Sequence, residues 1–293
     1  MTKNATDPRW LDEDGTPLDE EDRGLVYDVG TLVSRRAALG LFGGVATATL
    51  LAACTPQSAA TSGAATSAPT STPTPSASAP TSTSGPLTET PDETAGPYPG
   101  DGSNGVNVLD DSGIVRSDIR SSFGSSTTTV SGVPLTIRLT VRDAATGSAV
   151  VGAAVYLWHC DAAGNYSLYG SGLTNENFLR GVQETDETGT VQFVSIFPGC
   201  YSGRWPHAHF EVYDSVATAI SNGPIVKTSQ LALPAEQCSA VYAQSDYPAS
   251  ARNFSGMSLA TDNVFGNDGG IHQIATMSGS VDSGLTAAMT VGV

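Results

Sequence analysis

The chain has 293 residues, of which 39% are apolar and 14% are charged. Thirteen basic residues stand against 29 acidic ones, which gives a formal net charge of −16. Nucleic acids and anionic membrane surfaces are bound through basic patches, so this balance excludes both as partners. No apolar run suits a polytopic membrane protein, and the 32 glycines favour an all-β domain with many turns over a helical bundle.

Residues 1–54 predict an export signal rather than part of the fold. Residues 1–33 are polar and acidic without a regular apolar period, so we expect them to be disordered. Arg35 and Arg36 then precede a short apolar run, and this pattern resembles a Tat export signal. The run ends in Leu-Ala-Ala-Cys, which resembles a lipobox with Cys54 as the lipidated residue.

An uncleaved membrane anchor is the alternative interpretation of this signal. Its 17 apolar residues are few and rich in glycine, whereas a stable span needs about 20. We therefore expect export by a Tat-type route. The product would be a cell-surface lipoprotein or a secreted protein, which contacts the membrane only through the lipid anchor.

Composition divides the rest of the chain into a linker and a folded domain. Residues 55–87 are almost entirely Thr, Ser, Ala, Pro and Gly, with no charge and no aromatic side chain. Such a segment cannot bury enough apolar surface to offset the entropy of ordering, so we expect a low-complexity stalk. The folded domain is expected over residues 88–293.

Short segments with alternating apolar and polar residues follow one another along this domain. In the segment 133–143, Leu135, Ile137, Leu139 and Val141 alternate with Thr and Arg, which is the period of a half-buried strand. Gly and Asp turns separate the segments, and one short helix is expected over 233–239. The pattern predicts a β-sandwich. The expected strands are 133–143, 153–160, 189–197, 208–213, 225–233 and 284–291.

Two of the four histidines stand in the motif Arg-Trp-Pro-His-Ala-His-Phe, as His207 and His209. Residues two apart on a strand point to the same side, so both imidazoles can reach one metal ion. A His-x-His motif alone is weak, because it also occurs in zinc enzymes and other metal proteins. The neighbouring motifs make the pattern more specific.

Two tyrosines lie near the histidines at characteristic positions. Tyr166 follows Trp158 by eight residues, and Tyr201 follows a Pro-Gly turn that comes after a predicted strand. Arg204 stands three residues before His207. Near the start of the domain is the segment Thr-Ala-Gly-Pro-Tyr-Pro, residues 94–99.

This set of motifs, in this order, resembles the intradiol ring-cleavage dioxygenases, the family of the catechol and protocatechuate enzymes. The resemblance covers roughly residues 94 to 215, and the export signal resembles a secreted branch of that family. It implies an Fe(III) site held by two tyrosinates and two histidines, which here are Tyr166, Tyr201, His207 and His209. Phenolate is a hard anionic donor and suits ferric iron, whereas two histidines with one carboxylate suit ferrous iron.

The resemblance also implies a reaction and roles for individual residues. A catechol and O2 are the expected substrates, and the ring is cleaved between its two hydroxyl-bearing carbons to a cis,cis-muconate. Tyr201 is the tyrosinate expected to be displaced by the catechol, and Arg204 is expected to stabilise negative charge on the substrate. Gly96, Pro97 and Tyr98 are expected to line the substrate pocket. A structural ion pair is the alternative role for Arg204.

Three cysteines remain in the predicted domain, an odd number. An oxidising compartment favours one disulfide and one free thiol. We favour a Cys200–Cys238 bridge, because Cys238 stands in a loop-like segment that can clamp the short loop of Tyr201. A Cys160–Cys200 bridge stays open, since sequence does not determine connectivity.

Two alternatives to an intradiol dioxygenase come from other functional classes. The first is a non-catalytic β-sandwich that binds catecholates or iron. The second is a zinc hydrolase that uses His159, His207 and His209. The position of His159 next to Trp158 on an alternating strand favours a packed histidine over a ligand.

Overall fold

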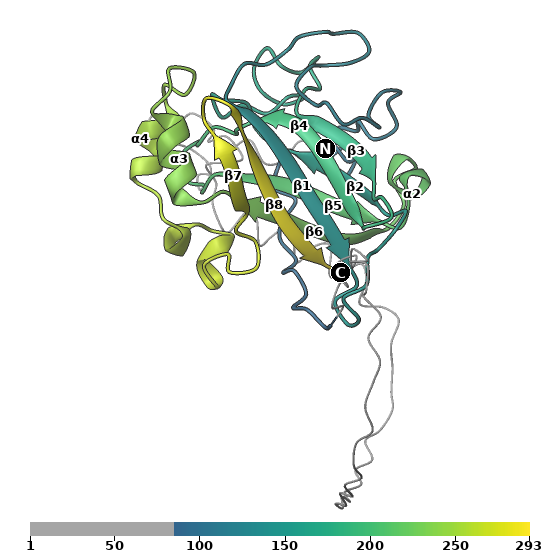
Figure 1. Ribbon diagram of the computed structural model, residues 1–293. Helices are drawn as coiled ribbons and strands as arrows, with labels where there is room; N and C mark the ends of the chain where they lie inside the picture. Colours follow the sequence, from purple (N-terminus) through teal and green to yellow (C-terminus); the bar gives the residue numbers. More distant parts are fainter. Residues whose placement is uncertain (1–84) are drawn as a thin grey trace, which may run out of the picture.

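The computed structural model describes residues 85–293 (Figure 1). The predicted disordered segment, the Tat-type signal, Cys54 and most of the predicted linker lie outside the described residues. Within residues 85–293, no helix is long and apolar enough to cross a membrane.

In this described part of the chain, eight strands form two four-stranded sheets that pack face to face (Figure 1). The first sheet has the order β4-β1-β8-β7 and the second has the order β3-β2-β5-β6. All pairs are antiparallel except β1 with β8. The predicted all-β sandwich is therefore confirmed. The strands are β1 Pro134–Arg142, β2 Ala154–Trp158, β3 Arg180–Glu184, β4 Thr190–Ile196, β5 His207–Tyr213, β6 Ile225–Ala232, β7 Thr276–Ser280 and β8 Gly284–Gly292.

Two of these strands have no counterpart among the predicted ones. Strand β3 begins with Arg180 and lacks an apolar alternation, and β7 is an exposed edge strand made of Thr, Met, Ser and Gly. Neither sequence alternates between apolar and polar residues, which is the pattern that predicts a strand. Pairing with a neighbouring strand, rather than burial of every second side chain, holds both strands in their sheets. The other six strands begin and end within two residues of their predicted bounds.

Short helices connect the strands. The predicted helix is α3, which begins after Pro234 and extends further than expected. Helices α3 and α4 lie together beside one end of the sandwich (Figure 1). The helical segments are α2 Val216–Ile220, α3 Ala235–Tyr242, α4 Ser250–Ser255, and the short 3-10 turns η3 Leu259–Thr261 and η4 Phe265–Asn267.

The main core lies between the two sheets, and strand β1 shows how the sequence builds it. Leu135, Ile137, Leu139 and Val141 all face this core and are almost completely buried, as their alternation predicts. Side chains from the inner face of β5 meet them, among them Phe210. At about 25 cal/mol per Å2 of apolar surface, this interface is the main stabilising contribution to the domain.

The second sheet is also covered on its outer face, and this second layer creates the place for a site. All seven residues of β5 are buried. On the outer side, Tyr156 and Trp158 of β2 pack with residues of the segment 95–114, including Leu109 and Ile114. Residues of β5 that point away from the main core are therefore enclosed by loops instead of facing water.

Tyr247 connects three distant parts of this sandwich. Its hydroxyl accepts a hydrogen bond from the Val133 N–H at 3.0 Å and donates one to the Phe197 carbonyl at 2.7 Å. Tyr242 makes a similar bond to the carbonyl of Pro198 at 3.0 Å. Together these two hydroxyls fix the Phe-Pro-Gly turn that leads to Tyr201.

We predict that Tyr247→Phe lowers the free energy of unfolding by about 1–3 kcal/mol, because it leaves two buried backbone groups without a partner. Denaturant unfolding monitored by fluorescence measures this. Ser239→Ala removes an exposed hydroxyl on α3 and serves as the control, with an expected change below about 0.5 kcal/mol. Equal stability of Tyr247→Phe and the wild type would contradict the role given to this hydroxyl.

Candidate metal centre

Four donor side chains from three parts of the chain converge on the outer face of the second sheet. His207 and His209 lie on β5 and point to the same side, away from the main core. Tyr166 comes from the loop after β2, and Tyr201 comes from the turn after β4. The structure thus brings together all four residues that were predicted as metal ligands.

The donor atoms lie unusually close to one another. The two histidine Nε2 atoms are 3.0 Å apart, and the two tyrosine hydroxyls are 3.4 Å apart. The Tyr166 hydroxyl lies 3.5 Å from Nε2 of His207 and 3.3 Å from Nε2 of His209. The Tyr201 hydroxyl lies 3.2 Å from Nε2 of His207. Such spacings are expected of donors that each lie about 2 Å from one shared cation.

The histidine ring nitrogens indicate why a cation fits here. Nδ1 of His207 lies 2.5 Å from the Trp205 carbonyl and must donate to it, so Nε2 of His207 presents a lone pair to the site. Nδ1 of His209 is buried and finds no hydrogen-bond partner among residues 85–293. With the His209 proton on Nδ1, both Nε2 atoms would present lone pairs, and a cation between them would satisfy both at once.

Burial keeps both imidazoles neutral. Desolvation, with the Arg204 charge as the next contribution, lowers the pKa of His207 to about 3. Desolvation and the neighbouring His207 lower the pKa of His209 well below its ordinary value. Neutral imidazole is the form that binds metals, so the environment prepares both rings as ligands.

Glycines let the two tyrosine loops approach each other. Gly164 has a positive φ of 93°, and a Cβ there would lie 3.0 Å from Cβ of Tyr201. A Cβ on Gly199 would lie 2.6 Å from the carbonyl oxygen of Ala162. The Pro-Gly turn and the Asp-Ala-Ala-Gly turn are therefore in direct backbone contact, and this contact sets the distance between Tyr166 and Tyr201.

The predicted substrate segment lies against the ligands. Gly96 has a φ of 70°, and a Cβ there would lie 3.1 Å from Cε1 of His209. The ring of Tyr98 lies 5.2 Å from the ring of Tyr166 and 4.9 Å from that of Tyr169. The Pro97 carbonyl accepts a bond from the Asn104 side chain at 2.7 Å. Tyr98 and Tyr169 thus form an aromatic surface that begins at the Tyr166 phenol.

Two further side chains support the site, and the sequence did not predict either role. The Trp158 indole stacks on the His209 ring with 4.9 Å between centroids and 5° between planes. Arg180, only 1% exposed, donates to the Tyr98 and Pro99 carbonyls and to the carbonyl and hydroxyl of Ser167. Arg180 therefore joins the substrate segment to the loop of Tyr166. A lone arginine at a strand start gives no sequence signal for such a role.

Arg204 lies in the site and in a buried ion pair at the same time. Its Nε donates to Oδ2 of Asp262 at 3.1 Å, and its Nη2 donates to Oε1 of Gln230 at 2.7 Å. Although burial opposes the charge, nearby Tyr201 and Asp262 raise the pKa of Arg204 above its ordinary value. Arg204 thus forms the structural ion pair that was its alternative predicted role, and it also lies beside the tyrosine phenols.

The predicted Cys200–Cys238 disulfide is absent from the structure, and so is the Cys160–Cys200 alternative. Cys200 and Cys238 carry free thiols, and all three cysteines are buried. Each thiol has a backbone carbonyl as its partner: Gly199 for Cys160, Arg204 for Cys200 and Leu233 for Cys238. Burial raises the pKa of the Cys200 thiol to about 12. Thiols packed in this way act as small apolar side chains with weak donors.

The two remaining histidines do not belong to the site. Both ring nitrogens of His159 are engaged, with the Cys160 carbonyl and the Ser195 hydroxyl, each at 2.7 Å. Within residues 85–293, no three His, Cys, Asp or Glu side chains are placed to share a metal ion. A zinc centre with His159 as third ligand therefore finds no support.

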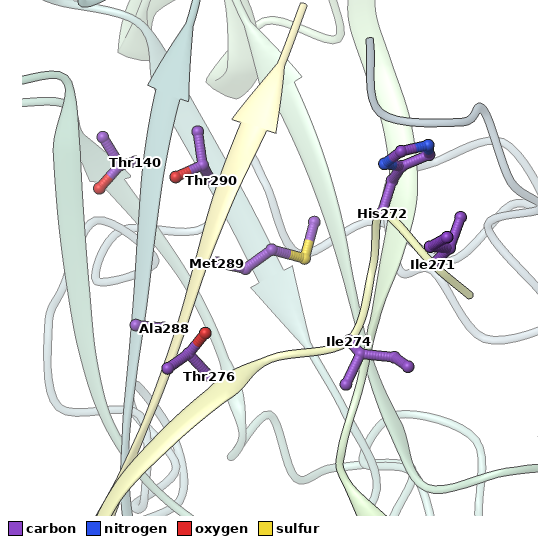
Figure 2. Close-up of a pocket in the computed structure, with 8 residues that line it drawn as sticks. All are labelled: Thr140, Ile271, His272, Ile274, Thr276, Ala288, Met289 and Thr290. Carbon is purple, nitrogen blue, oxygen red and sulfur yellow. The ribbon is translucent and has the colours of Figure 1, made fainter. Parts of the chain in front are cut away.

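His272 is exposed, and its ring borders a separate hollow of about 260 Å3 on the outer face of the first sheet (Figure 2). Threonines of β1, β7 and β8 and the side chains of Ile271 and Ile274 complete the lining. None of the four converging donors lines this hollow.

Comparisons with known proteins agree with the site. A family model described as "Dioxygenase" matches residues 118–220, which include all four donors and Arg204. No curated protein matches the sequence. An intradiol ring-cleavage dioxygenase from Tetranychus urticae is 26% identical over 62% of this chain and 87% of its own, with a TM-score of 0.51. The solved dioxygenase Tetur07g02040 is 25% identical over 70% of this chain and 94% of its own, with a TM-score of 0.55.

Fold and site together thus define a β-sandwich domain that carries a buried cluster of two tyrosines and two histidines. The matched segment and the two similar structures confirm the predicted resemblance to the intradiol ring-cleavage dioxygenases.

Glu93, just before the substrate segment, gives a prediction about pH. Burial raises the pKa of its carboxyl to about 7. Because this value exceeds the ordinary 4.5, the protonated form contributes stability that is fully present below about pH 4.5. That contribution is lost as the pH rises through 7. We expect Glu93→Gln, which stays neutral, to retain it at high pH.

The unfolding free energy of Glu93→Gln should therefore exceed that of the wild type by about 1–2 kcal/mol at pH 8, after discounting for partial exposure. The difference should approach zero near pH 4.5. Denaturant unfolding across this range measures it, and Glu236→Gln, an exposed carboxyl of α3, corrects for the general loss of one negative charge. A difference that does not depend on pH would disprove the prediction.

Proposed function

We propose that this chain is a non-haem Fe(III) intradiol dioxygenase, which cleaves catechols with O2 between the two hydroxyl-bearing carbons to give cis,cis-muconates. The single observation that carries the proposal is the convergence of two tyrosine hydroxyls and two histidine Nε2 atoms, of whose six pairs five lie 3.0–3.5 Å apart. Phenolates with neutral imidazoles are a donor set that stabilises ferric iron.

The two tyrosines differ in burial, and this difference suits them to different roles. Tyr166 is 3% exposed and enclosed by Tyr98 and Trp158, so it is suited to stay a permanent ligand. Tyr201 is only partly buried and can move without opening the core. Its phenolate oxygen would accept a proton from the incoming catechol hydroxyl, which is general-base work by a ligand. The four ligands would hold the iron, which, when bound, would orient both catechol oxygens and make the ring reactive toward O2.

Neighbouring side chains would bind and orient the catechol. Tyr98 lies beside the Tyr166 phenol and packs on Tyr169, so it offers an aromatic surface that fits a planar ring. Arg204 presents a buried, permanently charged donor next to Tyr201, where negative charge on the ring would be stabilised. The same enclosure excludes water and strengthens that interaction.

The test is to measure iron content, colour and oxygen consumption of the full chain with a panel of catechols, and to identify the products. We expect a red-brown protein that consumes O2 and forms muconates. His207→Ala should lose iron and colour, whereas Tyr201→Phe should retain iron with a shifted visible band and lower turnover. His272→Ala, a histidine outside the site, is the matched control and should retain both.

A His207→Ala protein with full iron and colour would refute the ligand assignment. An iron-loaded wild type that binds catechol without consuming O2 would instead favour the non-catalytic binding module.

We also propose that the domain is exported by the Tat route and retained at the cell surface by lipidation of Cys54. The twin arginine and the lipobox-like motif support this. We expect the double variant Arg35→Lys and Arg36→Lys to accumulate active precursor inside the cell. Cys54→Ala should move the protein from the membrane fraction to the medium. Fractionation with an activity assay checks both, and unchanged export of the double variant would point to another route.

A further inference from the structure

The guanidinium of Arg204 is held along one edge only. Nε and Nη2 lie on the same edge of a guanidinium, and here they donate to Asp262 and Gln230. Nη1 lies on the opposite side and makes no hydrogen bond to any residue of the described part. A buried arginine whose Nε and Nη2 each hold a protein acceptor keeps the two N–H groups of Nη1 for a ligand.

Asp262 is the more elaborate of the two partners. Its side chain is completely buried, and Oδ2 accepts from Nε of Arg204 and from the Trp205 N–H at 2.6 Å. Its other oxygen accepts from the N–H groups of Val264 and Phe265 at 2.8 and 2.9 Å. Four donors therefore hold this carboxylate in place.

The loop that carries Asp262 is packed against the metal centre. Phe265 is fully buried, and its ring lies 6.5 Å from the His207 ring. Trp205, Val264 and Phe265 form one apolar cluster with Ala232 of β6. Asp262 thus connects Arg204 and the chain leading into β5 to a rigid loop 58 residues away in the sequence.

We propose that Asp262 is a positioning residue of the active site, which fixes the Nε–Nη2 edge of Arg204 so that Nη1 is directed to the bound catechol. This inference rests on the proposed function. The carboxylate also balances the arginine charge within the site, so Arg204 acts as an oriented donor and does not collapse onto the Tyr201 phenolate. Without Asp262, the guanidinium would be free to turn toward that phenolate.

The first test is a double-mutant cycle in the full chain. We expect Asp262→Asn to lower kcat by about 10–100-fold, on the scale of a misplaced catalytic group, with iron content and KM for catechol little changed. In an Arg204→Gln background, the same substitution should have almost no further effect on kcat. Asp268→Asn, a carboxyl exposed on the same loop, is the control and should retain wild-type kcat.

Asp262→Glu keeps the charge and covers the case in which Asp262→Asn does not fold. We expect it to fold and bind iron but to lower kcat in the Arg204 protein alone, because the carboxylate moves by one methylene group. An equal loss of kcat with Arg204 present and absent would overturn the proposal. Wild-type kcat in either Asp262 variant would do the same.

A second readout does not depend on turnover. The Nε–H of Arg204, held by Asp262, should give a slowly exchanging signal in 15N NMR of the metal-free protein, identified by its loss in Arg204→Gln. It should exchange rapidly in Asp262→Asn and remain slow in Asp268→Asn. Unchanged exchange in Asp262→Asn would overturn the positioning role. Absence of turnover in the iron-loaded wild type would count against the proposed function alone. The exchange rate of the Arg204 Nε–H would still show whether Asp262 holds this guanidinium in place.

Discussion

His207 and His209 face each other with 3.0 Å between their Nε2 atoms, and both residues are almost completely buried. This arrangement is costly for a polypeptide alone, because buried lone pairs need a donor or a cation. It arises because β5 is buried on both faces, one by the sandwich core and the other by the segment 95–114. The rest of the site is organised around this doubly buried strand.

Both tyrosines reach the histidines on loops that cannot move independently. The contact of Gly164 with Tyr201 and of Gly199 with Ala162 brings the two turns together. The hydroxyls of Tyr242 and Tyr247 donate hydrogen bonds to the carbonyls of the turn before Tyr201 and so fix that turn. A ligand set built on such loops is preorganised, so metal binding would require little rearrangement.

Two buried arginines supply the positive charge near the site, and they are compensated differently. The hydrogen bonds of Arg180 that fix the substrate segment and the Tyr166 loop all go to uncharged oxygens. Arg204 is paired with the Asp262 carboxylate. Arg180 therefore fixes the positions of two loops. Arg204 is itself held in a fixed position and keeps a donor for a ligand.

The sequence by itself determined the sandwich and the identity of the four converging donors. Alternation in β1 marks the core, and the His-x-His spacing places both imidazoles on one side of a strand, because both signals depend only on the local period of two residues. Tertiary structure alone decided that β3 pairs with β2, that Cys200 and Cys238 form no disulfide, and that Asp262 meets Arg204. These features depend on contacts between segments tens of residues apart, which no local pattern encodes.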